Sequence, residues 1–362
     1  MLSLSAADLY LELIALSVAT LPLGLAIVRL GERLIGRSIR LSIPERLLLS
    51  LYATGGALYL VAALPIPIFG LGAVAVLLVG GLVIYAAIAT RERAAGVRAG
   101  VAFVRTTRGL TLSLLTLAVL AVEVVGVANL KVGNTLDGSV YSLFVNLLLA
   151  HHTIPWTLSP FANVGVTYPQ SAAVWVSLPV LLFGWPIITS PLALPPLFLA
   201  LSVPSAYCLG ERWTPDSTPW MRPWLGVLFA GFFGGVVSWP RLFVGGSFDF
   251  VFALPLFLVV LGWLVPLASA RPRPWREIAV FGVVVGIAAG LSAMVGLTLL
   301  LLLVGYLVAY RTLGVRSLLP WTYRWLAVAG IAALALVRSL VAVAVWFNYP
   351  GHVLTAEGHP PP

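Results

Sequence analysis

The sequence predicts an all-α, polytopic membrane protein, and three of its properties support this prediction. The chain of 362 residues is 60% hydrophobic and only 9% charged. Apolar runs of about 20 residues, the length that crosses a bilayer as a helix, recur from one end of the chain to the other. These runs lack the alternation of apolar and polar residues that membrane β-barrels show. Because lipid leaves exposed backbone groups without hydrogen-bond partners, we expect the runs to be helices.

The apolar runs predict about ten spanning helices. One long run exceeds a single untilted span, and the Gly-Leu-Ser sequence at 290–292 favours a tight turn within it. The expected spans cover residues 10–30, 47–64, 70–90, 109–128, 191–209, 224–240, 249–269, 277–291, 293–310 and 322–347.

Basic residues indicate how these helices are oriented. The formal net charge of +9 comes mainly from arginines in short clusters between apolar runs. This is the positive-inside pattern of membrane proteins, and it argues against nucleic acid as a partner.

Residues 171–189 decide the orientation, because they are apolar but short and end in a segment rich in proline and glycine. If they cross the membrane fully, the last three arginine clusters move outside. We therefore expect a re-entrant or half-buried helix here. Both chain termini and the loop 129–170 then lie on the outer side of the membrane. We expect this membrane to be the plasma membrane of a prokaryote, or one whose outer side is an equivalent lumen.

The loop 129–170 concentrates polar chemistry between two apolar segments. Asp137 opens a segment that we expect to form an amphipathic helix on the membrane surface. Asp137 serves either as the N-cap of this helix or as a functional acid. The apolar residues that share one face of the helix are Val140, Leu143, Phe144, Leu147 and Leu148.

Three further residues of this loop are candidates for substrate binding. His151 and His152 are adjacent, so they point in different directions on a helix, and we expect one to reach the site while the other meets water. Tyr168 either lines a substrate pocket or anchors the loop at the membrane interface.

Asp249 precedes an apolar run and is expected on the same side of the membrane as Asp137. Two acids at one membrane face can bind a divalent cation such as Mg²⁺ or Mn²⁺ through oxygen, or can divide into a base and a positioning group. The alternative role of Asp249 is that of an N-cap.

Glu123 and Arg338 lie inside predicted spans, where a charge requires a partner or a watery cavity. They pair with each other as a structural contact, or Arg338 holds a lipid phosphate through paired hydrogen bonds. The chain lacks a phosphate-binding Gly-rich loop, an HExxH motif and a nucleophile elbow, which disfavours an enzyme acting on soluble nucleotides.

The arrangement of Asp137, a loop helix ending in histidine, and Tyr168-Pro169 resembles the GT-C membrane glycosyltransferases. These enzymes use polyprenyl-phosphate-linked sugars and include protein mannosyltransferases, aminoarabinose transferases and oligosaccharyltransferases. In that family an acid in the first outer loop is essential, and Asp137 matches it. Asp249, approached through Pro240 and Arg241, resembles the family's second outer acid.

The resemblance covers roughly residues 109–347, which we expect to form a GT-C-like core. Residues 1–108 would be an N-terminal extension of three transmembrane helices, and residues 348–362 a polar, disordered tail. The chain departs from the family in two respects. Gly138 stands where paired acids are more usual, and a large C-terminal soluble domain is lacking.

The resemblance implies transfer of a sugar from a lipid-linked donor to an acceptor glycan, lipid or protein at the outer face. Asp137 would be the general base or a metal ligand, with Asp249 as its partner. Arg338, Arg241 and His151 or His152 would stabilise the departing phosphate. Two alternatives stay open. One is a transporter or flippase with Glu123 and Arg338 as coupling charges, and the other is a non-catalytic membrane subunit.

Overall fold

The computed structural model describes residues 5–35, 41–88, 102–128, 136–155, 170–213, 228, 248–267, 275–292, 295, 298 and 301–302. Within these residues every regular element is a helix, as the sequence predicts. The predicted spans that fall here appear as helices with bounds shifted by a few residues. They are α1 (Ala6–Ile35), α2 (Ile43–Ala62), α3 (Leu71–Ile88), α5 (Thr107–Ala128), α9 (Pro195–Trp213), α12 (Phe248–Leu267) and α13 (Trp275–Leu291).

Three segments within the described residues are long and apolar enough to cross a membrane: Ala6–Arg33, Thr107–Ala128 and Ser190–Arg212. Helices of this kind are compatible with an integral membrane protein. The total of about ten spans stays a prediction, because the runs 224–240, 293–310 and 322–347 lie largely outside the described residues.

Local sequence explains where α2 begins. The Ser42 side chain accepts a hydrogen bond from the Glu45 backbone, and the Glu45 carboxylate accepts one from the Ser42 backbone at 2.9 Å. This capping box satisfies amide groups that the first helical turn leaves without partners. Pro44 lies within the first turn, where its missing N–H costs nothing.

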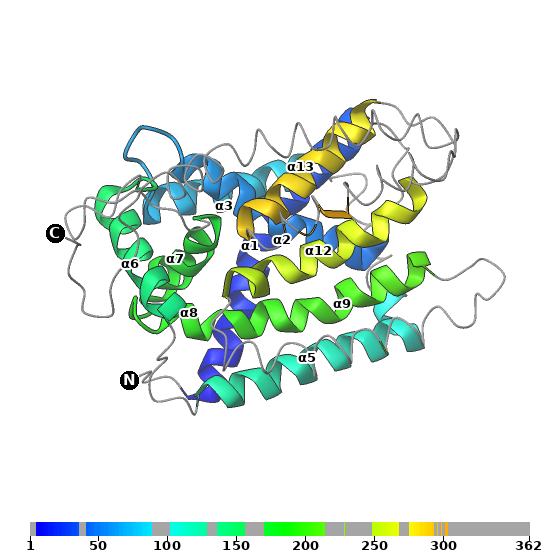
Figure 1. Cartoon of the computed structure of the whole chain (residues 1–362), viewed down its shortest axis with the longest axis horizontal. Helices are drawn as coiled ribbons and strands as arrows, with labels where there is room; N and C mark the ends of the chain where they lie inside the picture. Colours follow the sequence, from blue (N-terminus) through cyan, green and yellow to red (C-terminus); the bar gives the residue numbers. More distant parts are fainter. Residues whose placement is uncertain are drawn as a thin grey trace.

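The helices form a bundle with two distinct ends (Figure 1). The short helices α6 (Leu136–His151), α7 (Ser171–Phe183) and α8 (Ser190–Ala193) gather at one end, which we call the α6 end. At the opposite end Arg46 of α2 pairs with Glu32 of α1, and Arg212 of α9 pairs with Glu45 of α2. We call this the arginine end.

Helices α7 and α8 stay at the α6 end of the bundle (Figure 1). Gly184 ends α7 with a φ of 70°, a conformation that favours glycine. The chain then turns back, and the Ser190 hydroxyl donates a 2.6 Å hydrogen bond to the carbonyl of Val176 in α7. The Trp185 indole donates to the carboxylate of Glu12 near the start of α1. The expected return of residues 171–189 to one side of the membrane stays a prediction.

A cluster of buried aromatic side chains joins the bundle where α2, α7, α9 and α12 meet. Phe198 makes edge-to-face contacts with Tyr52, Trp175 and Phe252, at centroid distances of 6.0, 5.3 and 4.6 Å. Gly55 allows this packing, because a Cβ there would lie 2.3 Å from the Trp175 indole nitrogen. The cluster fixes how α2 faces α12 and therefore shapes the space beside them.

Candidate functional site

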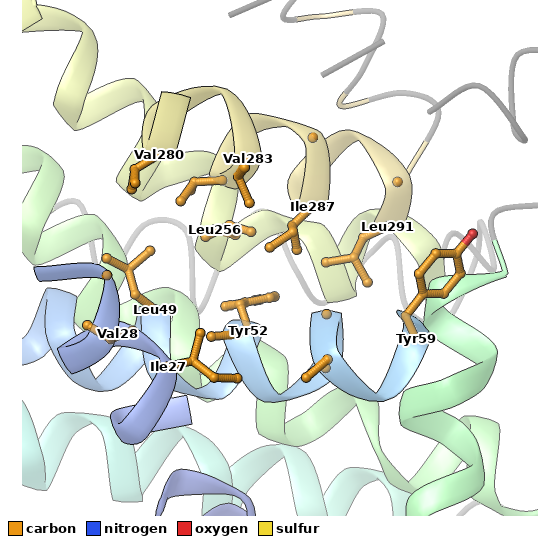
Figure 2. A pocket seen from close by; sticks show the side chains of 18 of the residues that line it. Ile27, Val28, Leu49, Tyr52, Tyr59, Leu256, Val280, Val283, Ile287 and Leu291 are labelled. Atoms are coloured by element: carbon orange, nitrogen blue, oxygen red, sulfur yellow. The ribbon is translucent and has the colours of Figure 1, made fainter. Parts of the chain in front are cut away.

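An apolar cavity of about 480 Å³ lies between α2 and α13, with α1 and α12 at its sides (Figure 2). Figure 2 shows Val280, Val283 and Ile287 of α13 pointing toward Leu49 and Tyr52 of α2. The aliphatic and aromatic residues that line the cavity are Ile27, Val28, Leu41, Leu49, Tyr52, Tyr59, Leu60, Trp175, Leu256, Trp263, Val280, Val283, Val284, Ile287 and Leu291. Such a lining suits an apolar ligand.

Small residues create the width of this cavity. Ala53, Gly56 and Ala57 line it from α2, and Gly286 and Gly290 line it from α13. Small residues on two facing helices leave a gap between the helices unless the backbones move closer together. A Cβ on Gly56 would lie 3.3 Å from Ile287, so the cavity is narrow at this point.

The α6 end of the cavity is polar. Ser171 and Gly290 both line it, and the Ser171 hydroxyl donates a hydrogen bond to the Gly290 carbonyl. Two residues later in the chain, the Ser292 hydroxyl donates a 2.9 Å hydrogen bond to Oδ2 of Asp249. The cavity therefore ends beside a half-buried acid held by a buried serine.

Gln170 lies next to this polar end, directly before Ser171. Its side chain is only 8% exposed, and its amide nitrogen donates a 3.1 Å hydrogen bond to the Pro155 carbonyl. The Pro155 carbonyl can only accept, so the Gln170 nitrogen faces it and the Gln170 amide oxygen points away from Pro155. That oxygen has no hydrogen-bond partner within the described residues. A buried acceptor without a partner is costly and is found preferentially at functional sites.

The structure distinguishes the two histidines at the end of α6. His151 ends the helix with an exposed side chain. His152 has a φ of 55°, which is uncommon for residues other than glycine, and its Nδ1 lies 2.8 Å from the Phe69 carbonyl oxygen. Since that oxygen only accepts, Nδ1 carries the hydrogen in this contact.

Hydrogen bonds join the end of α6 to the end of α2. The Phe69 amide donates to the His152 carbonyl at 2.8 Å, and the Thr153 hydroxyl contacts the carbonyls of Ala62 and Leu64 at 3.0 and 2.9 Å. These contacts hold the His152 ring in one position at the α6 end of the bundle.

The arginine end of the cavity carries charge. Glu32 lines the cavity and accepts hydrogen bonds from Arg46 at 2.9 and 3.2 Å and from Arg29 at 3.0 Å. Trp263 also lines the cavity and donates a 3.1 Å hydrogen bond to Glu45. Both ends of the cavity thus have polar groups, whereas its middle is apolar.

The structure places some of the predicted site residues and not others. Asp137 and Asp249 are each the second residue of a helix, α6 and α12, at the α6 end. The side chain of Asp137 lies outside the described residues, as do Tyr168, Arg241 and Arg338.

Glu123 of α5 is 1% exposed, and its Oε2 has no hydrogen-bond partner within the described residues. Within the same residues no group of three or more His, Cys, Asp and Glu side chains gathers as a metal site. The expected divalent cation at Asp137 and Asp249 stays a prediction.

Sequence reasoning missed Gln170, Ser171, Ser292 and the cavity itself. The available signals were the hydroxyl residues at the ends of apolar runs and the pair Gly55-Gly56 within one. It also missed that α1 and α2 share one core and one cavity with α12 and α13. Residues before 109 therefore contribute directly to the candidate site.

Comparison of the chain with known protein families, with curated proteins and with solved structures finds no significant match.

Proposed function

We propose that this protein is a membrane glycosyltransferase of the GT-C kind, which transfers a sugar from a polyprenyl-phosphate donor to an acceptor glycan, lipid or protein. The observation that supports this proposal best is that Leu291, which lines the apolar cavity, directly precedes Ser292, the hydrogen-bond partner of Asp249. A lipid-linked substrate needs this combination, because its chain and its head group require opposite surroundings.

The cavity suits the lipid part of the donor. Its lining is apolar along α2 from Leu49 to Leu60 and along α13 from Val280 to Leu291. Several lining residues are also accessible from outside the protein, including Leu60 and Val283, which are 68% and 49% exposed. A prenyl chain can therefore enter sideways from the lipid, and its burial in a close-fitting site is favourable.

The head group then emerges at the α6 end, which we propose faces the outside. Asp137 accepts the proton of the acceptor hydroxyl, whose oxygen bonds to the anomeric carbon of the sugar. The bond between that carbon and the phosphate oxygen breaks, and the polyprenyl phosphate leaves with the bonding electrons. Asp249 positions the reactants, while Arg241 and Arg338 stabilise the departing phosphate. His152 serves as the functional histidine, because its ring is held by Phe69.

A transporter or flippase is the second candidate, and the length of the cavity favours it. The cavity lining extends from Ser171 near the α6 end to Glu32 near the arginine end. Glu123, buried without a described partner, is then a coupling charge within the membrane. This function moves a solute or lipid without breaking a glycosidic bond.

The deciding experiment uses the full chain in lipid nanodiscs with a polyprenyl-phosphate-linked sugar. Donor binding and sugar release are measured in the same samples for wild type, Asp137→Asn, Asp249→Asn and Ala57→Phe. We expect both acid variants to bind donor and to lose release by a factor of about 100 or more, the contribution of a general base. Ala57→Phe places a ring in the cavity and should weaken donor binding.

Two results would overturn the proposal. Donor binding without any release by wild type, together with movement of labelled lipid between leaflets that Glu123→Gln abolishes, would identify a flippase. No donor binding by a folded wild type would favour a non-catalytic membrane subunit.

A further inference from the structure

The loop between α2 and α3 presents an unbroken run of apolar side chains. Its residues 64–68 read Leu-Pro-Ile-Pro-Ile, and all five are exposed, with Leu64, Ile66 and Ile68 at 42%, 56% and 45%. The loop lies at the α6 end, where it contacts the residues that follow α6 (Figure 1). We propose that this loop inserts into the hydrocarbon of the membrane, held in place by the end of α6, so that lipid acyl chains cover its side chains.

Charge does not hold this loop in water. From residue 47 to residue 90 the chain has no Asp, Glu, Lys, Arg or His, so the loop and most of both flanking helices are uncharged. We expect α2 and α3 to span the membrane. Their 20 and 18 residues make them about 30 and 27 Å long, close to the hydrocarbon thickness of about 30 Å. An exposed apolar segment between two such helices is favourable in contact with lipid and unfavourable in water.

The loop backbone suits a place without water. In hydrocarbon a backbone N–H or C=O group without a partner is costly. Both prolines of the loop lack an N–H group. The Ile68 amide donates a 2.8 Å hydrogen bond to the Ile66 carbonyl, and the Leu64 amide donates one of 3.3 Å to the Val61 carbonyl. A loop that faces water can leave such groups to the solvent, so their pairing within the protein favours lipid as the surroundings.

The residues that follow α6 pair with the loop and fix its shape. The Thr153 hydroxyl contacts the carbonyls of Ala62 and Leu64 at 3.0 and 2.9 Å. The Phe69 amide donates a 2.8 Å hydrogen bond to the His152 carbonyl. These contacts satisfy backbone groups on both sides of the loop and order it before it meets lipid. Little conformational freedom is then lost on insertion.

Lipid fits this surface better than a protein partner does. A protein interface combines apolar contacts with a polar rim and several hydrogen bonds. The exposed residues of the loop offer aliphatic side chains and prolines, and acyl chains require nothing else. Insertion does not depend on the proposed sugar transfer, so it can be measured without a donor.

The test attaches a nitroxide spin label to Ile66→Cys in the full chain, reconstituted in liposomes. Cys208→Ala removes the one native thiol. The label's collision rates are measured with oxygen, which concentrates in hydrocarbon, and with a nickel chelate, which stays in water. Val76→Cys, at a residue of α3 that is 73% exposed, is the lipid reference. Arg105→Cys, at an exposed charged residue before α5, is the water reference.

We expect the label at residue 66 to match the label at residue 76, with frequent oxygen collisions and few nickel collisions. Two results would overturn the inference. Collision rates like those at residue 105 would place the loop in water. Protection from both reagents would show that a second copy of the chain covers the loop.

Thr153→Val tests whether the end of α6 holds the loop. Valine keeps the shape of threonine but lacks the hydroxyl, so the carbonyls of Ala62 and Leu64 lose a donor. We expect faster motion of the label at residue 66 and more nickel collisions. Thr153→Ser keeps the hydroxyl and should leave both unchanged.

Unchanged motion and collisions in Thr153→Val would contradict the proposed support of the loop by α6. Thermal unfolding of every labelled variant shows whether a change in collisions reflects a loss of fold.

Discussion

The hydroxyl of Ser292 donates a 2.9 Å hydrogen bond to Oδ2 of Asp249, across 43 positions of the chain. This contact joins the residue after α13 to the first turn of α12. Because Gly290 and Leu291 line the cavity, the contact also places the carboxylate of Asp249 beside the cavity's α6 end. The Ser292 hydroxyl is thus the side-chain partner that connects Asp249 to the end of α13.

Replacement of Ser292 by alanine tests this connection. A hydrogen bond to a charged group contributes about 1.5–3 kcal/mol, so a freed Asp249 should lower sugar transfer by a factor of about 10 or more. Donor binding through the cavity should change little, because the apolar wall is intact. Ser292→Thr keeps the hydroxyl and should keep most of the activity. Equal losses in both variants would show that the site needs small side chains and not this hydrogen bond.

Gly55→Ala should destabilise the bundle. Its Cβ would lie 2.3 Å from the Trp175 indole nitrogen, which is too close for any real contact. Overpacking of this kind costs about 1–3 kcal/mol. Thermal unfolding in detergent measures the change. The matched control is Gly80→Ala, whose Cβ meets nothing within 4 Å and should stabilise α3 slightly by helix propensity. Equal stability of the two variants would contradict the packing described for Trp175.

Glu45→Ala should be among the most destabilising changes at the arginine end. Glu45 receives hydrogen bonds from Arg212 and Trp263 and from the Ser42 backbone, so its loss removes ties among α2, α9 and α12. Breaking one side of a buried ion pair costs about 3–5 kcal/mol, and the partial exposure of Arg212 places the expectation at the lower end.

Arg105→Gln serves as the surface control for this prediction, with an expected change within about 0.5 kcal/mol. If Glu45→Ala lowers the free energy of unfolding no more than the control does, water hydrates the Arg212 guanidinium in the variant and replaces the lost ion pair.

His152 and His151 should differ in their effect on activity. Both histidines are exposed, but the ring of His152 contacts the Phe69 carbonyl, whereas His151 ends α6 without such a contact among the described residues. We expect His152→Asn to lower sugar transfer about tenfold or more, the lower part of the range that proton transfer or charge stabilisation supplies. His151→Asn should have little effect. Asparagine tolerates positive φ, so this change removes the imidazole with little added backbone strain. Similar activities of the two variants would show that the His152 imidazole does not contribute to sugar transfer.

The sequence predicted the helices because their causes are local. Apolar runs of spanning length indicate a helix whatever lies beside it. The Ser42–Glu45 capping box is a further local cause that the prediction did not use, and it begins α2 at Ile43, before the predicted start at residue 47. The face of α6 was predicted in part. Phe144, Leu147 and Leu148 were expected on a face toward the membrane surface. They are instead buried within the protein, together with Tyr141 and Val145, because α6 packs against α7 and α8.

Contacts between distant helices could not be predicted in this way. Asp249 with Ser292, Ser171 with Gly290, and Trp185 with Glu12 are separated by 43, 119 and 173 positions. Nothing in the spacing of apolar residues specifies which helices are neighbours. The cavity has the same origin, since it depends on small residues of α2 meeting small residues of α13.

By itself the sequence determined the helical class, the apolar character of the helices, and the separation of arginines from the candidate acids along the chain. Hydropathy and charge are sums over neighbouring residues, so they are readable without a structure. Only the tertiary structure decided that α1, α2, α12 and α13 line one cavity, with Ser171 at one end and Glu32 at the other. That outcome depends on how side chains of separate helices pack, which is a property of pairs distant in the chain.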